Sequence, residues 1–291
     1  MTRSVRSSWV LGVAGALALA CQAATAATPA PMLGIDHIPL VVRDLERAAD
    51  QYRSLGFAIK PGRFHFDGIR NSHVKFADGA GIELITAPAA TDPVTSKYVQ
   101  LLSQGEGPAS VSFHTASLAA VQQHLDQMHV AYSVDGSFLE LSDPALDWLF
   151  VFEGNNLSPT DKPEYFNHPN GANATLGVWI AGGDRNRMLA FFKGLGARIE
   201  RQRVYVPDQL EATVARVANG EVIFLPQSRQ IIPGRPIVGV IFRVNDLPTA
   251  RRRSTPAAFD QAEDLQTPTY RSAFIKPENA LGVWLELREI H

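Results

Sequence analysis

The chain has 291 residues, which is enough for one large domain or two ordinary ones. Apolar residues make up 45% and charged residues 19%, a composition typical of a folded globular protein. The 27 basic and 29 acidic residues nearly cancel, so the chain lacks the positive field that attracts nucleic acids or anionic lipids. It also has no long basic run with interleaved aromatic residues. These features argue against nucleic-acid binding.

The N-terminal segment has the pattern of a secretory signal peptide. Arg3 and Arg6 give a positive start, residues 9–20 form an apolar run, and small residues up to Ala26 suit a signal peptidase. The apolar run is too short to span a bilayer. We therefore expect residues 1–27 to be a signal peptide, the mature protein to be periplasmic or secreted, and no stable membrane insertion after its removal.

The single cysteine, Cys21, leaves two alternatives for the N-terminus. A lipoprotein could be anchored at Cys21, although Ala18 stands where a lipobox usually has leucine. The leader could also remain as an uncleaved anchor. Cleavage after Ala26 instead leaves a mature chain without cysteine, which excludes disulfides and thiolate chemistry.

Four segments of the chain repeat the same order of predicted elements. Each begins with an apolar, β-branched strand, continues through a helix N-cap and an amphipathic helix, and ends in short extended segments. The predicted N-caps are Asp44, Ser117, Asp184 and Asp246. They lie 62 to 73 residues apart, whereas solenoid repeats have units of about 20–50 residues. Each segment is therefore interpreted as a βαβββ module.

A stretch rich in Asn and Pro separates the second module from the third. Residues 155–171 lack apolar periodicity, which is typical of a linker. The sequence thus predicts an α+β fold in which four βαβββ modules pair into two lobes. The first lobe comprises residues 32–154 and the second comprises residues 172–291.

The repeat and its local motifs resemble the glyoxalase-like branch of the vicinal oxygen chelate superfamily. The motifs are GIDHI at 34–38, HFDGIRN at 65–71, GIELI at 81–85 and the linker-like HPNGA at 168–172. The resemblance covers nearly all of the mature chain, more loosely in the third and fourth modules. It implies glyoxalase/dioxygenase-like lobes, in which paired modules form a cupped sheet. It also implies a divalent metal held by His and Glu from inward-facing strand positions.

His37 and Glu83 are the candidate metal ligands. Glu83 lies within an apolar strand, where an unpaired carboxylate is costly to bury, and His37 lies within another. Imidazole and carboxylate donors suit zinc, iron, manganese or nickel, and the resemblance places ligands at these two positions. His114 shares a strand face with Ser110, the counterpart of His37 in the second module, and is the candidate third ligand. The alternatives are a structural His–Glu pair, a metal-free pocket, and an ordinary strand-end role for His114.

Four further residues are candidates for contact with a substrate. The resemblance places His65 and Asn71 over the first cavity, in substrate contact or proton transfer, and their alternative is a surface loop. His168 precedes Pro-Asn-Gly, so it either closes over a cavity or shapes the linker. Glu153 ends the last strand of the second module and either completes the site or is an exposed strand-end carboxylate.

The second lobe lacks the histidine of the first. Gly177 and Gly239 stand at its counterpart positions, although Glu286 matches the acid of the first module. One acid without its histidine makes a poor metal site. We therefore expect this lobe to be structural, or to hold a metal-free apolar pocket lined by Trp179 and Trp284.

Two functions follow from these predictions, both with a small molecule as partner. The first is a metal-dependent lyase, isomerase or ring-cleaving dioxygenase that acts on a small oxygen-rich molecule, with the metal as Lewis acid. Glu83 and His65 would then move protons. The second is a metal-free protein that sequesters a small molecule, as resistance proteins of the superfamily do. The chain has no phosphate loop and no dinucleotide fingerprint, so we expect no nucleotide cofactor. The sequence does not specify an oligomeric state.

Overall fold

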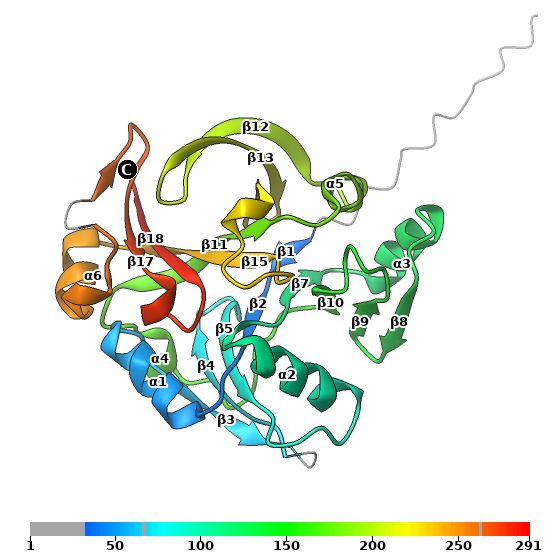
Figure 1. The fold of residues 1–291 in the computed structure, drawn as a ribbon, viewed down its shortest axis with the longest axis horizontal. Helices are drawn as coiled ribbons and strands as arrows, with labels where there is room; N and C mark the ends of the chain where they lie inside the picture. Colours follow the sequence, from blue (N-terminus) through cyan, green and yellow to red (C-terminus); the bar gives the residue numbers. More distant parts are fainter. Residues whose placement is uncertain (1–32, 66–67, 262–263) are drawn as a thin grey trace, which may run out of the picture.

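The computed structural model of the protein describes residues 33–65, 68–261 and 264–291, so the predicted signal peptide lies outside the described residues. Within these residues the strands form two five-stranded sheets and one eight-stranded sheet (Figure 1). No helix in this part of the chain is long and apolar enough to cross a membrane.

The first five-stranded sheet belongs to the first module. Its strands lie in the order β3-β4-β5-β2-β6. Strands β2 and β5 pair in parallel, and the connection between them includes helix α1. The elements are β2 (His37–Val41), α1 (Leu45–Ser54), β3 (Lys60–Phe64), β4 (Arg70–Lys75), β5 (Gly81–Thr86) and β6 (Gly107–Pro108).

The second five-stranded sheet belongs to the second module. Its order is β1-β7-β10-β9-β8, and the N-terminal strand β1 pairs antiparallel with β7. The chain therefore crosses from this sheet into the first one between β1 and β2. The elements are β1 (Gly34–Ile35), β7 (Val111–Thr115), α3 (Leu118–Gln127), β8 (Tyr132–Asp135), β9 (Phe138–Leu141) and β10 (Leu149–Glu153).

The third and fourth modules share the eight-stranded sheet, in the order β12-β13-β14-β11-β15-β18-β17-β16. Strands β11 and β15 pair antiparallel and join the two modules. The third module comprises β11 (Ala172–Ala181), α5 (Arg185–Gly194), β12 (Arg198–Tyr205), β13 (Gln209–Val217) and β14 (Gly220–Leu225), followed by η1 (Gln227–Arg229). The fourth comprises β15 (Ile237–Val244), α6 (Leu247–Arg253), η2 (Pro256–Ala258), β16 (Leu265–Gln266), β17 (Tyr270–Ile275), η3 (Pro277–Asn279) and β18 (Trp284–Ile290).

All four predicted N-caps begin helices. Each cap side chain accepts a hydrogen bond from the backbone N–H three residues later, at 2.8 Å for Asp246 and 3.3 Å for Ser117. Asp44 and Asp184 do the same at 3.1 and 3.0 Å. These bonds satisfy N–H groups that the first helical turn leaves without partners. The predicted α+β class and the βαβββ order are confirmed.

Two helices were not predicted. Helix α2 (Pro93–Gln104) connects the first and second modules and begins at Asp92, whose side chain forms a capping box with Thr95. The short helix α4 (Pro163–Phe166) lies within the predicted linker. Both begin with proline, which is favourable at the first helical position because its missing N–H costs no hydrogen bond there.

One apolar core extends across the two halves of the chain. The Phe242 ring packs edge-on against Phe57 and Phe76, with both pairs of ring centres 5.5 Å apart. Phe113 and Phe192 make a similar contact at 5.3 Å. The first and second halves therefore bury aromatic surface against each other. The domain boundary at 155–171 stays a prediction.

Candidate functional site

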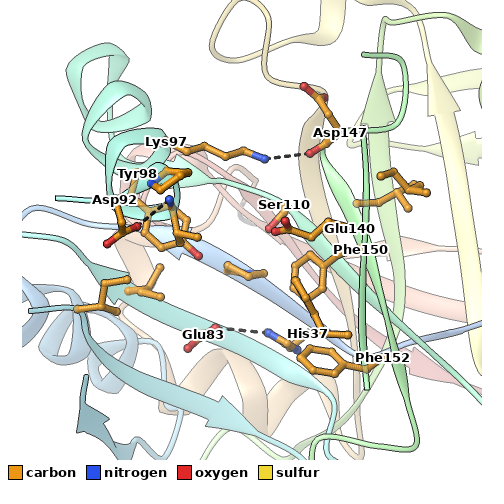
Figure 2. A pocket seen from close by; sticks show the side chains of 18 of the residues that line it. His37, Glu83, Asp92, Lys97, Tyr98, Ser110, Glu140, Asp147, Phe150 and Phe152 are labelled. Atoms are coloured by element: carbon orange, nitrogen blue, oxygen red, sulfur yellow. Dashed lines mark hydrogen bonds and ion pairs between the residues drawn. The ribbon is translucent and has the colours of Figure 1, made fainter. Parts of the chain in front are cut away.

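His37 and Glu83 face each other from adjacent strands of the first sheet. In the parallel pairing of β2 and β5, Pro39 lies opposite Glu83 and His37 lies opposite Gly81. The Nε2 atom of His37 lies 3.4 Å from Oε2 of Glu83, and the two side chains are 8% and 14% exposed (Figure 2). The structure thus brings together the two predicted ligand residues.

Neighbouring polar groups hold both side chains in place. On the far side of the imidazole, Nδ1 of His37 lies 3.3 Å from Oδ1 of Asp36 and 3.4 Å from Nδ2 of Asn156. Asn71 donates from Nδ2 to Oε1 of Glu83 at 2.6 Å. The pair is therefore oriented at both ends by hydrogen bonds.

Asn71 lies on β4, next to the strand of Glu83, and its side chain also contacts the irregular edge strand β3. The pairing of β3 with β4 shifts register between Pro61 and Phe64, and Oδ1 of Asn71 accepts the N–H of Arg63 at 2.9 Å. A Cβ atom at Gly62 would lie 2.0 Å from this oxygen, so only glycine leaves room for the side chain. Asn71 thus holds Glu83 and also lines the second cavity described below, and its contact with a substrate stays a prediction.

The two side chains form an ion pair at neutral pH. Burial disfavours the imidazolium, but hydrogen bonds to Asp36 and Glu83, together with their charges, raise the pKa of His37 to about 9. Burial likewise disfavours the carboxylate, yet the hydrogen bond and charge of His37 lower the pKa of Glu83 to about 2. Each partner thus stabilises the charged form of the other.

A cavity of about 510 Å³ lies against this pair. One wall is aromatic: the rings of Phe138, Phe150 and Phe152 lie 5.0 to 5.7 Å apart from one another. The imidazole of His37 meets Phe150 edge-on with ring centres 5.7 Å apart (Figure 2). Ser110 and Glu140 lie beside Phe150, whereas Asp92, Lys97 and Tyr98 lie across the cavity from it (Figure 2). The cavity therefore combines apolar surface with a few convergent polar groups.

A second cavity of about 580 Å³ shares four of its lining residues with the first. The shared residues are His37, His65, Glu83 and Phe152. The predicted loop residue His65 thus lies at both cavities, and its Nε2 atom is buried with no hydrogen-bond partner among the described residues. The other lining of the second cavity is mostly polar and basic, as described below.

The pair has part of the geometry of a metal site. Two metal–donor bonds of about 2.0–2.2 Å at a tetrahedral angle place their donor atoms about 3.4 Å apart. The carboxylate of Asp36 behind His37 is also the arrangement that orients histidine ligands. However, the described residues contain no group of three His, Cys, Asp or Glu side chains that could hold an ion.

The second module has no metal ligands at the positions that correspond to His37 and Glu83. Pro39 and Ser112 each stand five residues before their helix cap, and their partners across the parallel pairing are Glu83 and Phe150. Phe150 is therefore the counterpart of Glu83, and Ser110 is the counterpart of His37. The second module supplies a ring and a hydroxyl where a complete site needs donors. The described residues do not fit a three-ligand metal centre, and we assign no chemical step to a metal.

His114 and Glu153 lie away from both cavities. The ring of His114 covers Gly34 in the neighbouring strand β1, where a Cβ atom would lie 2.0 Å from Nε2. Four residues of strand separate His114 from Ser110, a distance of about 13 Å. Glu153 is exposed and accepts the N–H of Leu118 at the start of α3, at 3.4 Å. Neither prediction, metal ligation by His114 nor substrate contact by Glu153, is supported by this placement.

His168 is a core residue in this structure. Its Nδ1 accepts the N–H of Ala58 at 2.9 Å, and its Nε2 lies 3.1 Å from the carbonyl oxygen of Lys75. The rings of Phe57 and Phe76 pack edge-on against it, and burial lowers its pKa to about 4. It lines neither cavity described above. Because both ring nitrogens are occupied, this placement favours the alternative role, in which His168 docks the linker on the first module.

The second lobe is filled at the corresponding position. A Cβ atom at Gly239 would lie 2.2 Å from the ring of Trp179, which is completely buried. Glu286 is also completely buried, and it bonds Ser272 at 2.6 Å and Arg288 at 2.7 Å. Trp284 is partly buried and packs against the apolar cluster that includes Trp179. Trp179 thus occupies space that a pocket would need, which favours a structural second lobe.

The comparisons with known proteins agree with this fold. A family model described as a glyoxalase-like domain matches residues 35–219, so the chain belongs to this family. The predicted membership of the vicinal oxygen chelate superfamily is thereby confirmed. No curated protein matches the chain in sequence.

Solved structures match most of the chain at low identity. A hypothetical protein from Staphylococcus aureus has 12% identity and a TM-score of 0.59, covering 89% of this chain and 99% of its own. A triple mutant of 4-hydroxymandelate synthase from Streptomyces coelicolor has 13% identity and a TM-score of 0.65, with coverage of 90% and 93%. Homoprotocatechuate 2,3-dioxygenase from Arthrobacter globiformis has 11% identity and a TM-score of 0.62, with coverage of 90% and 81%. At these identities the likeness concerns the fold alone.

The aromatic wall and the polar contacts behind His37 were not predicted from the sequence. Phe150 and Phe152 alternate along β10 with buried residues, a period-two pattern that indicates one face distinct from the core. This pattern was available in the sequence. Asn156 follows β10 in an irregular segment, and nothing in its sequence neighbourhood indicates its contact with His37.

Proposed function

We propose that the protein binds a small molecule with an aromatic or other apolar group in the cavity beside His37 and Glu83. A volume of about 510 Å³ lies within the range of about 300–1,000 Å³ typical of ligand sites. The observation that carries the proposal is the edge-on contact of Phe150 with His37, because Phe150 stands where a second acidic donor would be. The cavity is thus suited to holding an apolar group against a polar pair.

The two sides of the cavity have different tasks in this proposal. The rings of Phe138, Phe150 and Phe152 offer the faces and edges that aromatic ligands pack against. Glu83, held in place by His37 and Asn71, offers a fixed acceptor to an N–H or O–H group of the ligand. The His37 imidazole lies between the carboxylates of Asp36 and Glu83, which stabilise its positive charge without a metal.

One specific observation favours a second candidate function, the metal-dependent lyase, isomerase or dioxygenase. The separation of 3.4 Å between His37 Nε2 and Glu83 Oε2 suits a shared divalent ion such as zinc, iron, manganese or nickel. Such an ion needs ligands beyond those that the described residues supply. The metal-free function is therefore the better supported of the two.

A ligand screen in the presence of a metal chelator tests the proposal. Aromatic small molecules should raise the unfolding temperature of the wild-type protein. Phe150→Ala should weaken binding of the selected compound about tenfold, since aromatic contacts contribute about 0.5–1.5 kcal/mol beyond buried area. Phe64→Ala is the matched control, because Phe64 is 71% exposed and lines neither cavity. Binding that needs an added divalent metal, or equal loss in both variants, would contradict the proposal.

A further inference from the structure

Two buried lysines line the second cavity, and both contact one buried aspartate. The side chains of Lys60 and Lys75 are 8% and 5% exposed, and that of Asp161 is 7% exposed. Lys75 Nζ lies 2.9 Å from Oδ2 of Asp161, and Lys60 contacts Oδ1 of the same carboxylate. Within this group of three side chains, two positive charges thus share one negative charge.

Asp161 carries one negative charge and cannot neutralise both lysines. Its Oδ2 also accepts the N–H of Ser158 at 2.7 Å. Burial raises its pKa, but hydrogen bonds from Lys60 and Lys75 lower the pKa to about 2, so it is already ionised at neutral pH. A buried charge without a counterion is costly. A bound anion would therefore stabilise the lysine pair further.

Two other carboxylates, those of Asp36 and Glu83, lie near this cavity, and both contact His37. Among the described residues that line it, Glu83 is the single carboxylate, and it is engaged by His37 and Asn71. The remaining charged lining residues, Arg63 and Lys162, are exposed and positive. Both the wall and the mouth of the cavity therefore favour a negative ligand.

Histidines other than His37 also line this cavity. His65 is one of them. His73 lines the cavity as well, and burial and the nearby charges of His37 and the two lysines lower its pKa to about 4. Its imidazole is then neutral and has one N–H to donate. An oxyanion would accept a hydrogen bond from this N–H group.

We propose that the second cavity binds the carboxylate of a small organic acid, while the apolar part of the same molecule lies against Phe152 and Phe150 in the first cavity. The four residues common to both cavities place the two halves of such a ligand side by side. Two lysines that already share Asp161, with the carboxylates of Asp36 and Glu83 nearby, match a monoanionic carboxylate better than a dianionic phosphate ester. The apolar half of the inference rests on the proposed function, whereas the anion site rests on the lysine pair.

Calorimetric titration with matched acids and amides tests the inference. The probes are benzoate, phenylacetate and 3-phenylpropionate with their three amides, in chelator-containing buffer. At least one acid should bind the wild-type protein ten or more times more tightly than its amide.

Lys75→Met should remove this preference, whereas Asp161→Asn should raise the affinity for the acid. Lys162→Met, at an exposed lysine of the same cavity, should lower that affinity two- to threefold. This variant should fold even if the buried substitution Lys75→Met does not.

The matched control is Lys276→Met, because Lys276 pairs with Glu278 at 3.5 Å and lines neither cavity. Equal binding of acids and amides, or equal behaviour of the Lys75, Lys162 and Lys276 variants, would overturn the anion site. If the probes bind without acid preference but depend on Phe150, the anion site fails and the proposed function stands. If acids bind independently of Phe150, the proposed function fails and the anion site stands. Failure of all six probes to bind counts against both.

Discussion

Phe150 holds, in the second module, the strand position that Glu83 holds in the first. The two residues face the same cavity, which is therefore polar on one side and aromatic on the other. A module pair with a donor at both positions would be able to surround an ion. In this chain a phenyl ring stands at the carboxylate position of the second module. Donors therefore come from the first module, where His37 and Glu83 form an ion pair.

Asn71→Ala should destabilise the protein by about 1–3 kcal/mol, because it leaves the buried carboxylate oxygen of Glu83 and the N–H of Arg63 without partners. Urea unfolding gives the change in free energy. Asn155→Ala, at an exposed asparagine of the connecting segment, should change it by less than about 0.5 kcal/mol. Equal effects of the two variants would show that the Asn71 contact does not hold the pair.

The ion pair predicts a specific pH dependence of stability. The folded-state pKa of His37, about 9, lies above its ordinary value of 6.5, so this contribution is full below 6.5 and is lost as the pH rises through 9. The folded-state pKa of Glu83, about 2, lies below its ordinary 4.5, so its contribution is full above 4.5 and is lost as the pH falls through 2. The pair is therefore most stabilising between about pH 4.5 and 6.5.

Between pH 6.5 and 9.5 the wild-type protein should lose roughly 1–3 kcal/mol of unfolding free energy relative to His37→Gln. Denaturant unfolding at several pH values measures this slope. His291→Gln removes an exposed C-terminal histidine and should keep the wild-type slope. If His37→Gln has the same slope as the wild type, the ion pair does not exist in the folded protein.

Gly239→Ala should destabilise the second lobe by about 1–3 kcal/mol or more, because the added Cβ would lie 2.2 Å from the buried ring of Trp179. Removal of the ring should relieve the clash. The double variant Gly239→Ala/Trp179→Leu should therefore be more stable than the sum of the two single effects. Strict additivity would indicate that the ring does not fill this position.

Much of the fold could be predicted from local sequence, because helix caps act over three residues. Asp44, Ser117, Asp184 and Asp246 therefore located four helices and, with them, the repeat. Helix α2 has an equally local signal in Asp92 and Pro93, but it lies outside the repeat and was not predicted. The class of the fold was thus within reach of sequence, whereas connections between modules were less so.

The site could be predicted only where the repeat itself placed residues. His37 and Glu83 follow from strand position, and they do converge. His114 shares a strand face with Ser110, but face alone does not tell how far along the strand a cavity extends. His168 and Asp161 lie in the irregular connection, and their contacts with Lys75 depend on tertiary packing. No periodic pattern in the sequence carries that information.

We propose that the mature protein acts outside the cytoplasm, because residues 1–27 have the composition of a signal peptide. Expressed with its leader in a bacterium, it should be recovered from the periplasm or medium, shortened by about 26 residues. Cys21→Ser should leave this product unchanged, whereas a lipid anchor at Cys21 would be lost in that variant. Recovery of the full-length chain from the cytosol would contradict export.

The metal content of the purified protein tests the central claim most directly. Wild type, His37→Ala and Ser110→His/Phe150→Glu are incubated with zinc or manganese, freed of excess ion and analysed by mass spectrometry. We predict far less than one ion per chain in the first two, and close to one in the double variant, whose second module then carries donors at both counterpart positions. One ion per wild-type chain that is lost in His37→Ala would contradict the account and establish the metal-dependent function instead.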